Sequence, residues 1–185
     1  MLQEITAPDY DVDFDVVYAT DRNFTGTPVY QRAAFYLLPE AAALLRRAIA
    51  IAAPLGYRLK LLDGFRPSEA QWKLWNHTPD PEFIADPRRG SPHSMGAAVD
   101  LTLLDAASGA ELDMGTPFDD LRPLSHHGVT DGISTEAQKN RVILMGIMTS
   151  AGFDFFRNEW WHYQLFNARA RYPVLTDAAA GTRMM

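Results

Sequence analysis

Two short segments of the chain carry side chains that can ligate a metal ion and activate water. The first reads S-P-H-S-M-G-A-A-V-D and contains His93 and Asp100. The second reads N-E-W-W-H-Y and places Glu159 three residues before His162 among aromatic residues. A carboxylate in an apolar run, such as that of Asp100, is costly unless a partner or a metal stabilises it. The two segments together indicate a hydrolytic metal site.

Because the chain contains no cysteine, any metal must be held by histidine and carboxylate side chains. Taken alone, Asp100 could accept backbone hydrogen bonds and His93 could be a surface loop residue, and only the second segment favours a shared site. His126 and His127 are rival ligands, but adjacent residues rarely point at one metal. We expect at most one of them near the site, and we expect His77, in a proline-flanked loop, to be exposed.

The spacing between Glu159 and His162 sets a geometric condition on the site. Residues three apart point to opposite faces of a regular strand, whereas on a helix they share one face. The aromatic run at 160–166 favours a strand. Glu159 must therefore lie before that strand, in a turn or a bulge, if it is to act beside a metal ligand.

The two segments together resemble a known family. The pattern S-x-H-x-x-G-x-A-x-D followed by E-x-x-H is similar to that of the zinc peptidases of the D-alanyl-D-alanine family, which are related in fold to hedgehog-type and lysostaphin-like domains. Further stretches within about 15–166 resemble the dipeptidase (VanX-type) branch of that family: Y-A-T-D-R-N-F-T-G, D-G-F-R-P, D-L-T-L, M-G-x-x-F-D, S-H-H and G-I-S.

The resemblance implies a zinc ion held by His93, Asp100 and His162, with an open fourth position. Glu159 would then be the general base, and Arg66 would stabilise the oxyanion. These roles agree with the chemistry of the groups, since zinc polarises a carbonyl and acidifies a water molecule. A guanidinium is always charged and can donate to a developing oxyanion.

The resemblance also implies how the substrate is held. Asp119 and Ser91 would bind the free amino group of the substrate, and Tyr18 would line the pocket. Arg66 has a structural alternative, in which it pairs with Asp63 and stabilises the turn between them.

The activity that the resemblance implies is zinc-dependent hydrolysis of the D-Ala-D-Ala dipeptide to two molecules of D-alanine. A D,D-carboxypeptidase or an L,D-endopeptidase acting on peptidoglycan stem peptides would use the same chemistry and is an alternative. A binding module with a structural zinc is an alternative from another class of protein. The presence of Glu159 favours catalysis, because a catalytic centre needs a base beside the water.

Composition limits the other functions that the chain can have. Its 185 residues fit one domain, and a formal net charge of -6 disfavours a nucleic-acid partner. Neither a signal peptide nor a membrane-spanning run is recognisable, so we expect a cytoplasmic protein. The sequence leaves the oligomeric state open.

The elements that must position these residues alternate without the regular pattern of a doubly wound sheet. We therefore expect an α+β fold with a central, largely antiparallel sheet flanked by helices. One domain would span residues 1–185, with its core at about 15–166 and a flexible tail at about 172–185. Helices are expected at 39–53, at 67–75 and from 134 or 135 to about 152, and strands or extended segments at 16–20, 57–63, 99–104 and 160–166.

Overall fold

The fold is built on a five-stranded sheet with the strand order β2-β4-β5-β7-β6 in the computed structural model, which describes residues 1–185. The β2–β4 pair is parallel and the other three pairs are antiparallel, which confirms an α+β fold with a largely antiparallel sheet. These strands are β2 (Val12–Phe14), β4 (Tyr57–Asp63), β5 (Ala98–Asp105), β6 (Asp154–Phe155) and β7 (His162–Gln164). A separate antiparallel pair joins β1 (Gln3–Glu4) and β3 (Tyr36–Leu37).

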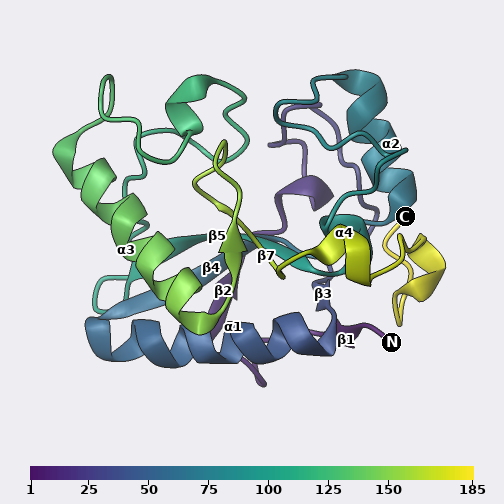
Figure 1. The fold of residues 1–185 in the computed structure, drawn as a ribbon. Helices are drawn as coiled ribbons and strands as arrows, with labels where there is room; N and C mark the ends of the chain where they lie inside the picture. The colour runs from purple at the N-terminus through teal and green to yellow at the C-terminus, as the bar shows by residue number, and fades with distance from the viewer.

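Two helices pack together against the sheet, and a third stands apart from them. The helices are α1 (Pro39–Ala52), α2 (Ser68–His77), α3 (Thr135–Ala151) and the short α4 (Ala168–Arg171). The first and the third contact each other and reach β4 and β5, whereas α2 lies on the opposite side of the molecule from α3 (Figure 1). None of the helices combines the length and apolar character that crossing a bilayer requires.

Local signals in the sequence account for the ends of the longest helices. Pro39 occupies the first position of α1, where its missing N–H has no cost. The hydroxyl of Ser134 accepts the N–H of Ala137 at 3.0 Å and begins α3, and Gly152 ends it in the left-handed conformation. The predicted helices at 39–53 and from 134 or 135 are thus confirmed.

The central strand, β5, is buried along almost its whole length between β4 and β7. The pairing of β4 with β5 shifts by one residue after Leu61, so that Leu62 is the extra residue of a β-bulge. The shift brings Asp63 opposite Asp100, and Asp100 is opposite His162 on the next strand. Three polar residues therefore lie abreast on three neighbouring strands, and all three are buried.

The prediction of an extended segment at 16–20 is wrong, because Val17–Ala19 forms a single 3-10 turn. The hydroxyl of Thr20 donates to the carbonyl of Val17 at 2.8 Å, and the side chain of Asn23 donates to the carbonyl of Thr20 at 2.7 Å. These local hydrogen bonds compete with strand pairing. The β-rich composition of the segment instead provides buried side chains, Tyr18 among them.

The strand predicted at 160–166 is shorter in the structure, where it covers only His162–Gln164. The backbone N–H of Trp160 donates to the carbonyl of Ser125 at 3.1 Å, and its indole N–H donates to the hydroxyl of Thr116 at 2.9 Å. Trp160 therefore anchors a turn to a neighbouring loop and does not extend the sheet.

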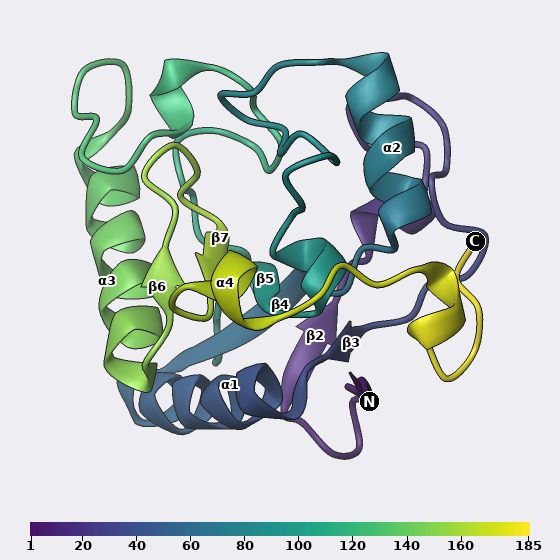
Figure 2. The ribbon, with the colours of Figure 1, turned by 45° about the vertical axis from the view of Figure 1, so that its right-hand side comes forward.

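The C-terminal residues, expected to be flexible, are packed against the domain. The carboxylate of Asp177 accepts the N–H groups of Met184 and Met185 at 2.7 and 3.2 Å, and the side chain of Met184 is buried. The carbonyl of Met184 accepts the N–H of Gln31, so the tail lies beside the segment before β3 (Figure 2). Together with the burial of Ile5, this extends the core beyond residues 15–166.

We expect Asp177→Ala to release this tail. The change leaves two backbone N–H groups without their acceptor, which costs about 1–3 kcal/mol when such groups stay buried. Carboxypeptidase digestion should then remove the last residues faster, and the urea midpoint should fall. The exposed Asp131 provides the matched control, and equal digestion of Asp177→Ala and Asp131→Ala would contradict the role of Asp177.

Candidate active site

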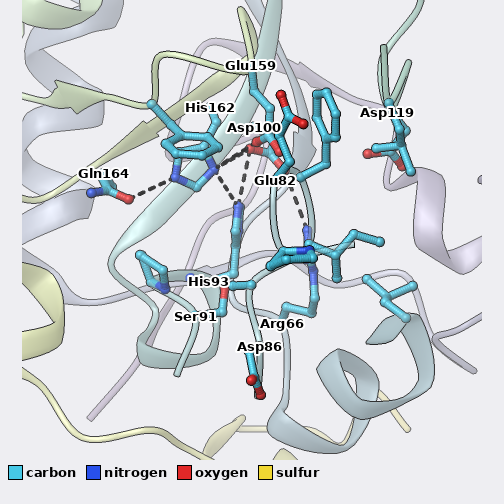
Figure 3. Close-up of a pocket in the computed structure, with 18 of the residues that line it drawn as sticks. Arg66, Glu82, Asp86, Ser91, His93, Asp100, Asp119, Glu159, His162 and Gln164 are labelled. Atoms are coloured by element: carbon cyan, nitrogen blue, oxygen red, sulfur yellow. Dashed lines mark hydrogen bonds and ion pairs between the residues drawn. The ribbon is translucent and has the colours of Figure 1, made fainter. Parts of the chain in front are cut away.

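Three buried side chains from separate elements converge at one point. His93 lies in the 3-10 turn His93–Met95, Asp100 lies in β5, and His162 is the first residue of β7. The Nε2 atom of His93 is 3.0 Å from Nδ1 of His162. The Oδ1 atom of Asp100 is 3.2 Å from the former nitrogen and 3.1 Å from the latter (Figure 3).

The outer nitrogen of each imidazole faces an amide oxygen. His93 Nδ1 is 2.7 Å from the carbonyl of Gly64, and His162 Nε2 is 3.0 Å from Oε1 of Gln164. Because these oxygens only accept hydrogen bonds, each outer nitrogen carries a proton and donates it. The two inner nitrogens and Oδ1 of Asp100 thus face one another at 3.0–3.2 Å, an arrangement that a bound cation would stabilise.

The spacing of the three inner atoms fits a tetrahedral metal ion. Ligands at about 2.0–2.1 Å from a zinc ion are about 3.3 Å apart at the corners of a tetrahedron, close to the separations of 3.0–3.2 Å observed here. Burial alone would raise the pKa of Asp100, but the two imidazoles lower it below its ordinary value, which favours the anionic ligand. These residues can therefore hold a metal ion.

A glycine turn carries the chain from His93 into β5. Gly96 follows the 3-10 turn with a φ of +69°, and a Cβ atom there would come within 2.4 Å of the side chain of Leu2. Only glycine meets both conditions without strain. The hydroxyl of Ser91 accepts the backbone N–H of His93 at 3.3 Å and steadies the same turn.

Glu159 lies in a turn before β7, as its spacing from His162 requires. Its Oε2 atom is 3.8 Å from Nδ1 of His162, and its side chain is buried. Burial, together with the charges of Asp100 and Asp119, raises the pKa of Glu159 well above its ordinary value. A carboxylate in this position takes up a proton more readily than an exposed glutamate.

Arg66 is buried between structural partners and the candidate metal ligands. Its guanidinium donates to Asp63 from Nε at 2.9 Å and to Gln71 at 3.0 Å, and it lies 3.6 Å from Oδ2 of Asp100. The same group stands over the ring of Tyr18, 4.8 Å from its centroid. The pairing with Asp63 that the sequence offered as a structural alternative is thus present, and Arg66 also faces the site.

All eight residues singled out in the sequence line one cavity of about 200 Å³. Besides the three metal-ligand candidates, Glu159 and Arg66, they include Tyr18, Ser91 and Asp119. In Figure 3, Asp119 lies on the opposite side of the candidate ligands from Gln164. The fold therefore brings together residues that are up to 144 positions apart in the chain, as from Tyr18 to His162.

Asp119 is held in an unusual environment. Its backbone is left-handed, with a φ of +60°, which aspartate tolerates better than most residues. Its buried Oδ2 atom has no hydrogen-bond partner in the protein. Burial raises the pKa of Asp119 to about 7, with a further increase from the charge of Asp100 and an opposing effect of Arg66. The group is suited to a cationic partner from outside the chain.

The other three histidines contribute no atom to the cavity wall. His126 packs against Phe83, and His127 packs against the rings of Phe155 and Tyr163. His77 is exposed, as expected.

Some residues that line the cavity were not predicted from the sequence. Gln164, which orients His162, could have been found because residues two apart share a face of a strand. Nothing in the sequence pattern indicated the roles of Arg89 and Arg169 in the wall.

Comparisons with known proteins identify the family to which the chain belongs. A family model described as D-Ala-D-Ala dipeptidase, peptidase family M15, matches residues 2–178. The chain is 41% identical over 167 residues to the D-alanyl-D-alanine dipeptidase of Escherichia coli, an alignment that covers 90% of this chain and 85% of that protein. It is 36% identical over 176 residues to the protein of the same name from Enterococcus faecalis, with 84% and 87% covered.

The family match extends over nearly the whole chain, and these alignments include most of each relative. The chain is a member of the M15 peptidase family of D-Ala-D-Ala dipeptidases.

Proposed function

We propose that this protein is a zinc-dependent dipeptidase that hydrolyses D-alanyl-D-alanine to two molecules of D-alanine. The observation that carries the proposal is the convergence of His93, Asp100 and His162 beside Glu159 in one small cavity. Its volume of about 200 Å³ lies below the range of ~300–1,000 Å³ typical of sites for drug-sized ligands. The names of the relatives support the choice of substrate.

Each residue of the site has a separate role in the proposed hydrolysis. Zinc held by His93, Asp100 and His162 would supply Lewis acidity to the scissile carbonyl and bring the pKa of a water molecule towards ~7. Glu159 takes a proton from the attacking water as the new C–O bond forms. The C–N bond then breaks, and Glu159 delivers that proton to the leaving amine. Arg66 stabilises the negative charge that develops on the carbonyl oxygen.

Recognition of a free amino group accounts for a preference for dipeptides. Asp119 offers a buried, unpaired carboxylate oxygen to the substrate ammonium, and Ser91 and Tyr18 complete that part of the cavity. A longer stem peptide has an amide in place of that ammonium and would leave the Asp119 charge buried without a partner, which is costly.

We expect zinc-loaded protein to hydrolyse D-Ala-D-Ala, and Glu159→Gln to lower kcat by about 10²–10⁴-fold because the general base is lost. Amine release from D-Ala-D-Ala, L-Ala-L-Ala and a pentapeptide ending in D-Ala-D-Ala measures both activity and preference. Glu136→Gln, an exposed change on α3, is the matched control and should retain full activity. Preferential cleavage of the pentapeptide would instead select a D,D-carboxypeptidase, and inactivity on all three would favour a binding module.

Zinc should stabilise the fold through the two inner imidazole nitrogens. A ligand present at 1,000 times its Kd stabilises the native state by about 4 kcal/mol, so the Tm of protein treated with a chelator should rise on addition of zinc. Elemental analysis should find one zinc ion per chain. His162→Ala should lose both effects, while His77→Ala, a change in an exposed histidine, should keep them. A zinc response that His162→Ala preserves would refute this assignment.

The ionisation of Asp119 should govern substrate affinity. With a pKa raised to about 7, its carboxyl is protonated at acidic pH and becomes an anion as the pH rises through that value. Affinity for D-Ala-D-Ala should therefore increase from about pH 5.5 to about pH 7.5, below the pKa of ~8 of a peptide amine.

Calorimetric titration of the Glu159→Gln variant measures this pH dependence without turnover. Addition of Asp119→Asn should weaken binding and remove the rise with pH, whereas addition of the exposed change Asp131→Asn should alter neither. An unchanged pH dependence after Asp119→Asn would assign the titration to another group.

A further inference from the structure

Two arginines in the cavity wall have no carboxylate partner within the chain. Arg89 lies in the loop after α2 and Arg169 lies in α4, and both line the same cavity as the candidate metal ligands. Two other arginines nearby already pair with carboxylates of the chain. Arg66 pairs with Asp63, and Arg88 donates to both carboxylate oxygens of Asp86. Arg89 and Arg169 take part in no ion pair of the structure.

The backbone holds Arg169 in place and leaves its terminal nitrogens free. Its Nε atom donates to the carbonyl of Gly90 at 2.9 Å, and neither terminal nitrogen forms a hydrogen bond. Burial, followed by the nearby charge of Arg89, lowers the pKa of Arg169 below its ordinary value. The two guanidinium groups thus lie near each other in the wall. Asp86 lines the same cavity but already pairs with Arg88, so an anionic ligand would neutralise the two groups further.

The charged side chains of the cavity wall are distributed unevenly along its length. Arg169 is tied to the residue before Ser91 and follows Gln164 by five positions. Gln164 lies on the side of the candidate ligands away from Asp119 (Figure 3), and Arg169 lies in α4, the element that follows β7. An unpaired carboxylate thus stands at one end, the candidate metal ligands stand in the middle, and unpaired guanidinium groups stand towards the other end.

We propose that Arg89 and Arg169 form a subsite for the α-carboxylate of the dipeptide. A dipeptide at neutral pH has an ammonium at one end and a carboxylate at the other, with the scissile bond between them. Its charges match the ends of the cavity when the ammonium is at Asp119 and the scissile carbonyl is beside Glu159. Guanidinium groups bind carboxylates through short, charge-assisted hydrogen bonds, often two at a time.

This inference rests on the proposed function and makes it more specific. The pair would select ligands with a free C-terminus, so a C-terminal amide would bind less well than the corresponding acid. Asp119 reads the other end, and the two subsites together would require that both termini of the substrate be free. The distance between the subsites then sets the length of peptide that can satisfy both.

The test compares D-Ala-D-Ala with its C-terminal amide. Calorimetry on Glu159→Gln protein gives the two dissociation constants, and turnover by protein with Glu159 intact gives kcat and KM. We expect the acid to bind at least about 10-fold more tightly than the amide. Arg89→Gln with Arg169→Gln should weaken binding of the acid by about 10-fold to 100-fold, raise KM similarly and change binding of the amide by less than about 3-fold.

Two further variants separate charge recognition from structural damage. Arg169→Lys keeps a cation and should recover part of the affinity for the acid. Arg47→Gln removes one positive charge on α1, outside the cavity, and should have no effect. Equal losses for acid and amide, or undiminished binding of the acid by the double variant, would overturn the subsite.

The two proposals fail in different ways. Tight binding of the acid with the expected loss in the double variant, but no turnover by the zinc-loaded protein, would refute the dipeptidase and keep the carboxylate subsite. Normal turnover with the acid-to-amide ratio unchanged in the double variant would keep the dipeptidase and refute the subsite. Failure of the protein to bind the acid at all would overturn the subsite directly.

Discussion

The mutual approach of two imidazole nitrogens and a carboxylate is the interaction on which the rest of the site depends. Such a cluster is unfavourable without a cation, so it persists only where the surroundings fix every member. The outer nitrogens are held by the Gly64 carbonyl and the Gln164 amide, and Asp100 is fixed in the central strand. The sheet provides this rigidity because its neighbouring strands present these groups at fixed spacing.

Around that centre several charged side chains are buried: Asp63, Arg66 and Glu159. Asp63 accepts hydrogen bonds from Arg66 and from the hydroxyl of Tyr30, so its charge is satisfied inside the fold. Glu159 and Asp119 lack comparable partners, and burial raises the pKa of both. The carboxylate whose hydrogen bonds are formed within the protein thus supports the fold. The carboxylates that lack such partners face the cavity, where a substrate could supply them.

The sequence was most informative where the signal was local. Helix α1 and strand β4 follow from helix formers after Pro39 and from the alternation at 57–63, and the motif residues gather as the resemblance implied. Contacts between distant segments could not be read in this way. Trp160 forms a turn because it binds a loop near Ser125, and the tail is ordered by Asp177 and by the segment before β3. Neither of these two contacts produces a periodic pattern in the sequence.

The bulge at Leu62 ties the chemistry to the length of the chain as well as to its composition. In a strand, the side to which each residue points depends on how many residues precede it. Insertion of one further residue between Leu62 and Asp63 would keep every functional side chain in the sequence, yet it would move Asp63 past its place opposite Asp100 and take its carboxylate away from Arg66. In this part of the fold, the number of residues constrains the site more tightly than the type of the residues between them.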